Sequence, residues 1–306
     1  MSRKSLDASP AGASGVHSNR RRSGWRRGFL YVLPALAFYV IFAVLPMAHT
    51  VYLSFFDWDG ITMASWVGLE NYQEVLTDPE LRGAVLNALI LVIFFSWLPV
   101  VIGMLMVGLL ARHRPRGMTA FRLLFFLPQV VPLVAVGITW RWMYSSDGVV
   151  NQTLRTVGLD ASTRAWLGDA DFALLAVGLV GMWAMSGLCM ILFFTGAQKV
   201  DPNLHEAARL DGAGPIREFV TVTLPALRGE VAVALTVTTV AALASFDIVY
   251  VTTSGGPAGS TNVPGLLVYR LAFSQYEVGL AAALATVLAG MILVLVFTIA
   301  RLVKPE

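Results

Sequence analysis

Long apolar runs constrain this 306-residue chain more than any other feature of its sequence. A helix needs about 20 mostly apolar residues to cross the hydrocarbon core of a bilayer. Charged residues make up 13% of the chain, against roughly 25% in soluble domains. The sequence therefore predicts an all-α polytopic membrane protein with six transmembrane helices, over residues 29–48, 83–111, 123–140, 172–198, 231–251 and 278–300.

The basic residues are distributed unevenly among the segments that connect these runs. Lysine and arginine concentrate in cytoplasmic connections. Only four of the 22 basic residues lie in the connections assigned to the outside, whereas 17 lie in residues 1–28, 112–122, 199–230 and 301–306. We therefore expect both termini to be cytoplasmic. Residues 1–28 also contain few large apolar side chains, so we expect a disordered basic tail followed by a membrane domain over 29–306.

The third of these inner segments, 199–230, has the pattern of two short helices joined by a tight turn. Asp201 is suited to cap the first helix, and Gly212 to end it in a left-handed conformation. Pro215 is suited to begin the second helix, and Pro225 to stop it before the fifth span. Apolar residues recur in the second helix at a spacing that predicts one face, formed by Ile216, Phe219, Val220 and Thr223.

The first of these short helices carries two adjacent small side chains. Ala207 and Ala208 lie beside Glu206, and small side chains let another backbone approach closely. An amphipathic loop lying on lipid headgroups would explain the apolar face but not this surface. A DNA-reading helix pair would need a basic recognition helix, which is missing, so we expect no nucleic-acid partner. The pattern favours a docking site for a cytoplasmic protein.

The sequence offers no set of residues for catalysis or metal binding. Its three lysines lie outside any phosphate-binding glycine loop, and its four histidines lack the spacing of metal ligands. We therefore expect no enzymatic activity, no metal and no cofactor. If the chain carries out work, the energy must enter through a partner.

The fifth apolar run and the outer segment 253–262 contain two further candidate sites. Asp247 interrupts the fifth run, and a charge within a span is by default a functional candidate. Asp247 and the nearby Tyr250 are predicted to line a substrate path or to pack helices together, and a proton-carrying role for Asp247 stays open. In the outer segment 253–262, a polar turn contains Gly255, Gly256 and Pro257 and is a candidate for docking an external protein.

The inner segment resembles the "EAA" loop of bacterial ABC importer permeases. The matching residues are Glu206, Ala207, Ala208, Gly212, Leu224 and Pro225, at that family's spacing; Val222 stands where isoleucine is usual. "FRLLFFLPQVVPLVAVGITWRWMY" and "FDIVYVTTSGGP" are similar to segments of the sugar permeases of the maltose and glycerol-phosphate type. The resemblance runs from about residue 29 to the end.

This resemblance implies a function and a set of partners. The chain would be one permease subunit of an importer that moves a carbohydrate across the cytoplasmic membrane of a bacterium by alternating access. Its partners would be a second permease, two ATPase subunits and an extracytoplasmic solute-binding protein. The residues that couple it to the ATPase would be Glu206, Ala207, Ala208, Asp211, Gly212, Leu224 and Pro225. Two alternatives stay open: a permease for another small solute, such as a polyol or glycerol phosphate, and a membrane scaffold without transport.

Overall fold

The structure is a computed structural model that describes residues 31–110 and 117–303. Its regular elements are helical apart from one short antiparallel pair, β1 (Phe56–Asp57) and β2 (Ser65–Trp66). The all-α prediction is confirmed for these residues. The basic tail predicted over 1–28 lies outside them.

Contacts divide the chain into two units, 1–49 and 50–306, and each is described by itself. The described part of the first unit belongs to one helix, which begins at Tyr31 and ends at Leu53, a few residues into the second unit. This helix contains a π-helical turn, η1 (Val40–Val44), followed by α2 (Leu45–Leu53). It is long and apolar enough to cross a membrane.

Three further helices of the second unit are also long and apolar enough to span a bilayer. The first joins α4, the π-helical turn η2 and α5 without a break, and Asp78 caps it by accepting the N–H groups of Glu80 and Leu81. The bounds of these elements are α4 Pro79–Val92, η2 Ile93–Trp97, α5 Leu98–Leu110, α9 Ala173–Ala197 and α16 Val278–Leu302.

Two more apolar segments are sharply bent rather than straight. The predicted third span breaks at Pro132, and its halves, α6 (Met118–Val130) and α7 (Leu133–Met143), meet at 98°. Proline has no N–H to continue a helical ladder, and it disfavours a helical residue before it. The chain therefore has four long helices in its described residues, and up to six spans if each bent pair is one span. Six spans stay a prediction.

The second bent pair includes the inner segment. Helices α11, η4 and α12 together diverge by 69° from α13, and the break is at the buried Leu227. The predicted fifth span, 231–251, is also interrupted: α13 ends at Leu243, and a separate helix begins at Asp247. The bounds are α11 Pro215–Glu218, η4 Phe219–Thr223, α12 Leu224–Ala226, α13 Arg228–Leu243 and α14 Asp247–Thr252.

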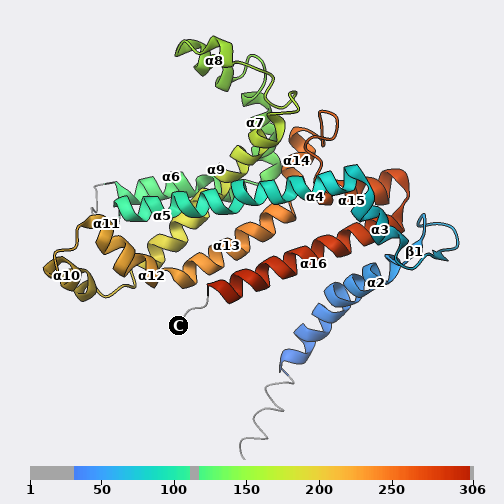
Figure 1. Cartoon of the computed structure of the whole chain (residues 1–306), viewed down its shortest axis with the longest axis horizontal. Helices are drawn as coiled ribbons and strands as arrows, with labels where there is room; N and C mark the ends of the chain where they lie inside the picture. Colours follow the sequence, from blue (N-terminus) through green and yellow to red (C-terminus); the bar gives the residue numbers. More distant parts are fainter. Residues whose placement is uncertain (1–30, 111–116, 304–306) are drawn as a thin grey trace, which may run out of the picture. The chain divides into compact units, whose positions relative to one another are not determined.

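The remaining short elements connect these helices. Figure 1 shows α8 and its neighbouring loop at the end of α7, and α15 beside α4 and α16. Their bounds are α3 Glu70–Thr77, α8 Val149–Thr156, η3 Asp160–Ser162, α10 Pro202–Leu210, α15 Pro264–Arg270 and η5 Leu271–Gln275.

The long helices of the second unit lie side by side, with α5 and α6 against α9, and α13 against α16 (Figure 1). Glycines of α9 permit this packing, because a Cβ at Gly181 would overlap the ring of Phe95, and one at Gly187 would overlap the backbone of Phe125. Lipid tails are as apolar as the side chains, so there is little hydrophobic driving force between membrane helices. Small residues let such helices approach closely, and the resulting van der Waals packing holds them together. This packed frame supports the inner segment described next.

Candidate functional site

A helical hairpin over residues 202–226 forms the segment that was predicted as the inner loop. Its first arm, α10, begins at Asp201, whose carboxylate accepts the N–H of Asn203 at 2.9 Å. It ends before Gly212, which has a φ of +78°. An aspartate cap pairs a backbone donor that the first turn leaves free, and glycine adopts positive φ without a side-chain clash. Both local predictions are confirmed.

The second arm begins at Pro215 and ends beside Pro225, as predicted. Only one helical residue, Ala226, follows Pro225, and the bend before α13 falls at Leu227. The predicted stop before the fifth span is therefore confirmed, and proline, which cannot donate a backbone hydrogen bond, marks its place.

The single apolar face predicted for the second arm is wrong. Thr223 is buried and Phe219 is half-buried, but Ile216 is 82% exposed and Val220 is exposed as well. Phe219 and Thr223 line the cavity beside α5, whereas Ile216 and Val220 line a separate surface pocket, so the four side chains are divided between two sides of the arm.

Five of the predicted coupling residues form one accessible surface on α10 and the turn, which we call the 206–212 surface. Ala208 is half-buried, and the others are exposed; the members are Glu206, Ala207, Ala208, Asp211 and Gly212. Leu210, beside them, is 89% exposed, and a Cβ placed on Gly212 would meet no atom within 4 Å. The other two predicted residues, Leu224 and Pro225, lie in α12 and not in this surface.

An ion cluster ties the two arms of the hairpin together. The carboxylate of Glu218 accepts hydrogen bonds from Nε of Arg209 at 3.1 Å and from Nη2 at 2.9 Å. It also lies 2.9 Å from Nδ1 of His205. Hydrogen bonding from Arg209 holds the pKa of the Glu218 carboxyl below its usual value, against burial, which raises it. The same contact raises the pKa of Arg209.

The sequence prediction missed this cluster, although a signal for it exists. His205 and Arg209 are four residues apart on α10, so they lie on one face of that helix. Glu218 has the complementary charge in the next helix. Pairing across a turn requires knowledge of the angle between the arms, which spacing along the chain does not supply.

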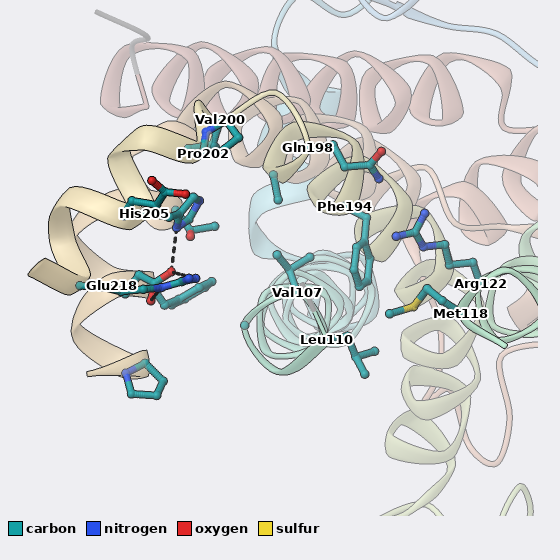
Figure 2. Close-up of a pocket in the computed structure, with 17 residues that line it drawn as sticks. Val107, Leu110, Met118, Arg122, Phe194, Gln198, Val200, Pro202, His205 and Glu218 are labelled. Atoms are coloured by element: carbon teal, nitrogen blue, oxygen red, sulfur yellow. Dashed lines mark hydrogen bonds and ion pairs between the residues drawn. The ribbon is translucent and has the colours of Figure 1, made fainter. Parts of the chain in front are cut away.

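A cavity of about 500 Å³ lies between the hairpin and helices α5, α6 and α9. His205 and Glu218 lie at one side of it, while Arg122 and Phe194 lie at the other (Figure 2). The guanidinium of Arg122 lies 4.5 Å from the centre of the Phe194 ring, and its Nε is buried and has no hydrogen-bond partner among residues 31–110 and 117–303. The hairpin therefore does not fill the space next to the long helices.

The sequence predicted that Asp247 lies inside a continuous fifth span, but the structure interrupts this span. Three residues without helical structure, 244–246, separate α13 from α14, and Asp247 is the first residue of α14. Its side chain is exposed in this chain. A carboxylate is stabilised at the N-terminus of a helix by the unpaired N–H groups and the helix dipole. The two predicted roles of Asp247, in a substrate path or in packing helices together, therefore stay predictions.

Tyr250 belongs to a ladder of four aromatic rings. It stacks on Phe246 with ring centres 5.2 Å apart, and it meets Tyr269 edge-on at 5.8 Å. Tyr269 in turn contacts Phe273 at 5.5 Å; the rings of Tyr250, Tyr269 and Phe273 are exposed, and that of Phe246 is half-buried. Ring faces held in this way form an apolar but hydrogen-bonding platform, because each tyrosine adds a hydroxyl group.

The turn that contains Gly255, Gly256 and Pro257 is held against α4. Nδ2 of Asn87 donates to the carbonyl oxygens of Ser260 at 3.0 Å and Asn262 at 2.9 Å. The amide of Asn262, which is 1% exposed, donates to Glu80 at 2.7 Å. Gly255 itself is buried, whereas Gly256 and Pro257 are half-exposed, so only part of this predicted docking site is accessible.

No cluster of three or more histidine, cysteine, aspartate or glutamate side chains suited to a metal ion occurs within residues 31–110 and 117–303. The site features of this part of the chain are therefore the hairpin, the cavity behind it and the aromatic ladder.

Long apolar helices that pack through glycines define the class of this molecule as a multi-pass membrane protein. Residues 100–305 match the family described as "Binding-protein-dependent transport system inner membrane component". The chain belongs to this family.

Relatives and solved structures agree with this assignment. The chain is 33% identical to the diacetylchitobiose uptake system permease protein NgcF of Streptomyces coelicolor, over 87% of this chain and 80% of that protein. It is 33% identical to the trehalose/maltose transport system permease protein MalF of Thermococcus litoralis, over 90% and 92%. Its fold is similar to a chain of a bacterial alginate ABC transporter in complex with an alginate-bound periplasmic protein. In that comparison the TM-score is 0.77, the identity is 21%, and 94% of this chain and 98% of that chain are covered.

Proposed function

We propose that the chain is one permease subunit of an ATP-driven importer that moves a carbohydrate into a bacterial cell by alternating access. A second permease, two separate ATPase subunits and an extracytoplasmic solute-binding protein complete the assembly. ATP is hydrolysed by the ATPase subunits, and this chain has no enzymatic activity of its own. The observation that carries the proposal is the exposed 206–212 surface on a hairpin that leads directly into α13.

The coupling role rests on what this surface offers a partner. Glu206 supplies a charge, Ala207 and Gly212 supply little bulk, and Leu210 supplies apolar area that is 89% exposed. Small residues let the backbone of a partner approach closely, so the partner would also cover Leu210. Leu224 and Pro225 serve the same function from α12, next to the bend that joins the hairpin to α13.

The orientation follows from the charges. With 17 basic residues in one set of connections and four in the other, the hairpin and both termini face the cytoplasm. The turn with Gly256 and Pro257 then faces the outside, where a solute-binding protein docks.

The aromatic ladder supports a carbohydrate as the solute. Sugars present apolar C–H faces and polar rims, and a tyrosine ring matches both. Tyr250 and Tyr269 offer such rings, with the carboxylate of Asp247 one helical turn from Tyr250 as a hydrogen-bond acceptor. The relatives described above are named for diacetylchitobiose and for trehalose and maltose. A polyol or glycerol phosphate has no such ring face to stack, so it is the less favoured solute, and a scaffold without transport needs no platform of this kind.

Reconstitution of the purified complex in liposomes tests this function. The binding protein, loaded with a labelled sugar, is supplied on the extracytoplasmic side of the complex, and ATP is supplied on the cytoplasmic side. Uptake of the label is measured over time. We expect accumulation that needs both ATP and the binding protein, and its loss in the Glu206→Lys variant although the variant still inserts into the membrane. Uptake that continues without ATP, or an assembly that moves no solute, would contradict the proposal.

A further inference from the structure

We propose that Glu218 is a positioning residue that makes the two arms of the 202–226 hairpin move as one body. The inference rests on the proposed coupling function of the hairpin but adds a residue that touches neither solute nor ATPase. The side chain of Glu218 is 8% exposed, whereas four of the five residues of the 206–212 surface are exposed.

Without this residue, little connects α10 to the rest of the molecule. No side chain of α10 is fully buried, so α10 is not anchored by core packing. The link to the second arm contains two glycines, Gly212 and Gly214, and glycine is the residue that resists bending least. A nine-residue helix is also too short to be stable alone in water. A force applied to α10 would therefore bend the turn unless the arms were braced.

The ion cluster supplies this brace. Two hydrogen bonds from one guanidinium to one carboxylate fix both distance and angle, and charge-assisted bonds are roughly twice as strong as neutral ones. The side chain of Glu218 is 8% exposed. A movement that separated its carboxylate from Arg209 without hydrating it would leave a buried, unpaired charge, which is strongly unfavourable.

The second arm is itself attached to the long helices. The ring of Phe219 packs at Gly108 of α5, and Thr223 and Leu227 are buried. Glu218 thus links an exposed helix to an arm that already contacts the membrane domain. A displacement of the 206–212 surface passes through Glu218 to α12 and α13, and the cavity behind the hairpin leaves room for it.

The cluster also predicts a pH-dependent behaviour that a passive structural role would not produce. In the native chain Arg209 stays charged, so the brace does not depend on His205. If Arg209 is removed, His205 is the remaining partner, and it binds a carboxylate more strongly as an imidazolium than as a neutral ring. The other charged groups around the cavity are Glu206 on α10 and Arg122 on α6.

The experiment compares variants of the complete reconstituted complex by the number of solute molecules moved per ATP, at about pH 6 and about pH 8, on either side of the usual histidine transition. We expect Arg209→Gln to couple about fivefold less well at the higher pH than at the lower, relative to the unmodified complex. Arg209→Gln/His205→Gln should be poorly coupled at both. Glu218→Gln should be poorly coupled at both as well.

Arg217→Gln is the matched control, because Arg217 is the exposed neighbour of Glu218 on α11 and makes no ion pair with a described residue. It should behave as the unmodified complex does. Full coupling in Glu218→Gln, or an Arg209→Gln variant with the pH response of the unmodified complex, would overturn the inference. If Glu218→Gln fails to insert, the Arg209→Gln comparison decides alone. An unmodified complex without ATP-driven uptake would instead refute the proposed function.

Discussion

The hydroxyl oxygens of Ser96 and Thr238 lie 2.7 Å apart, on η2 and α13, and both side chains are completely buried. Thr239 adds a third hydroxyl, 3.1 Å from that of Ser96. Buried hydroxyl groups must find partners, and here they find them across two helices that are far apart in the sequence. Ser96 belongs to the π-helical turn η2, so the polar contact with α13 is made at the irregular turn of this long helix.

This contact predicts a stability difference. Thr238→Val keeps the shape of the side chain but removes one hydroxyl, which should lower the free energy of unfolding by about 1 kcal/mol. Thermal unfolding of the purified protein in detergent measures the change. Thr236→Val, on the same helix but outside the cluster, is the control and should have a smaller effect. Equal effects of the two substitutions would show that the cluster contributes nothing specific.

The proposed orientation predicts where cysteines can be labelled. After Cys189 is replaced, Ser254→Cys should react with a membrane-impermeant maleimide in intact cells, because Ser254 is exposed in the turn assigned to the outside. Leu210→Cys, on the hairpin, should react only after the cells are opened. The reverse pattern would mean that the molecule is inserted the other way round.

Gly212 predicts a separation between folding and coupling. Its φ of +78° disfavours any side chain by about 1 kcal/mol or more, yet the space around it is empty. Gly212→Val should therefore be inserted into the membrane but should bind the ATPase weakly, measured by co-purification. Gly214→Val is the control, since Gly214 has a φ of −71° and also has open space around it. Normal ATPase binding by Gly212→Val would contradict a docking role for the turn.

The aromatic ladder predicts a loss of apparent affinity for the solute. Tyr250→Ala should raise the KM for uptake about two- to tenfold, because an aromatic contact contributes roughly 0.5–1.5 kcal/mol. Tyr250→Phe should have a smaller effect, since the ring remains. Trp142→Ala changes an exposed aromatic residue outside the ladder and should leave KM unaltered. A ladder that only packs helices would lower the amount of folded protein in Tyr250→Ala and leave KM as it was.

Asp247 offers a test between a polar and a charged role. The side chain is exposed at the start of α14 and makes no ion pair within residues 31–110 and 117–303. Asp247→Asn keeps a hydrogen-bond acceptor and should retain most of the uptake, measured in the reconstituted complex. Abolished uptake in an assembled complex would indicate a step that needs the negative charge, such as proton transfer.

The sequence alone determined the membrane class, the helical fold and the ends of the first arm of the hairpin. Apolar length is decisive because a bilayer offers no water to the backbone, so helices are the way for such runs to pair their N–H and C=O groups. Asp201 and Gly212 act through their own turn of backbone, so their effects are visible within a few residues of sequence.

Only the tertiary structure decided which side chains meet. The bend at Pro132, the break before Asp247 and the position of Ile216 and Phe219 on different sides of the second arm depend on contacts with neighbouring helices. The pairing of Arg209 with Glu218 depends on the angle between two short helices. Such angles are set by packing between segments distant in the chain, and periodicity along one segment carries no record of them.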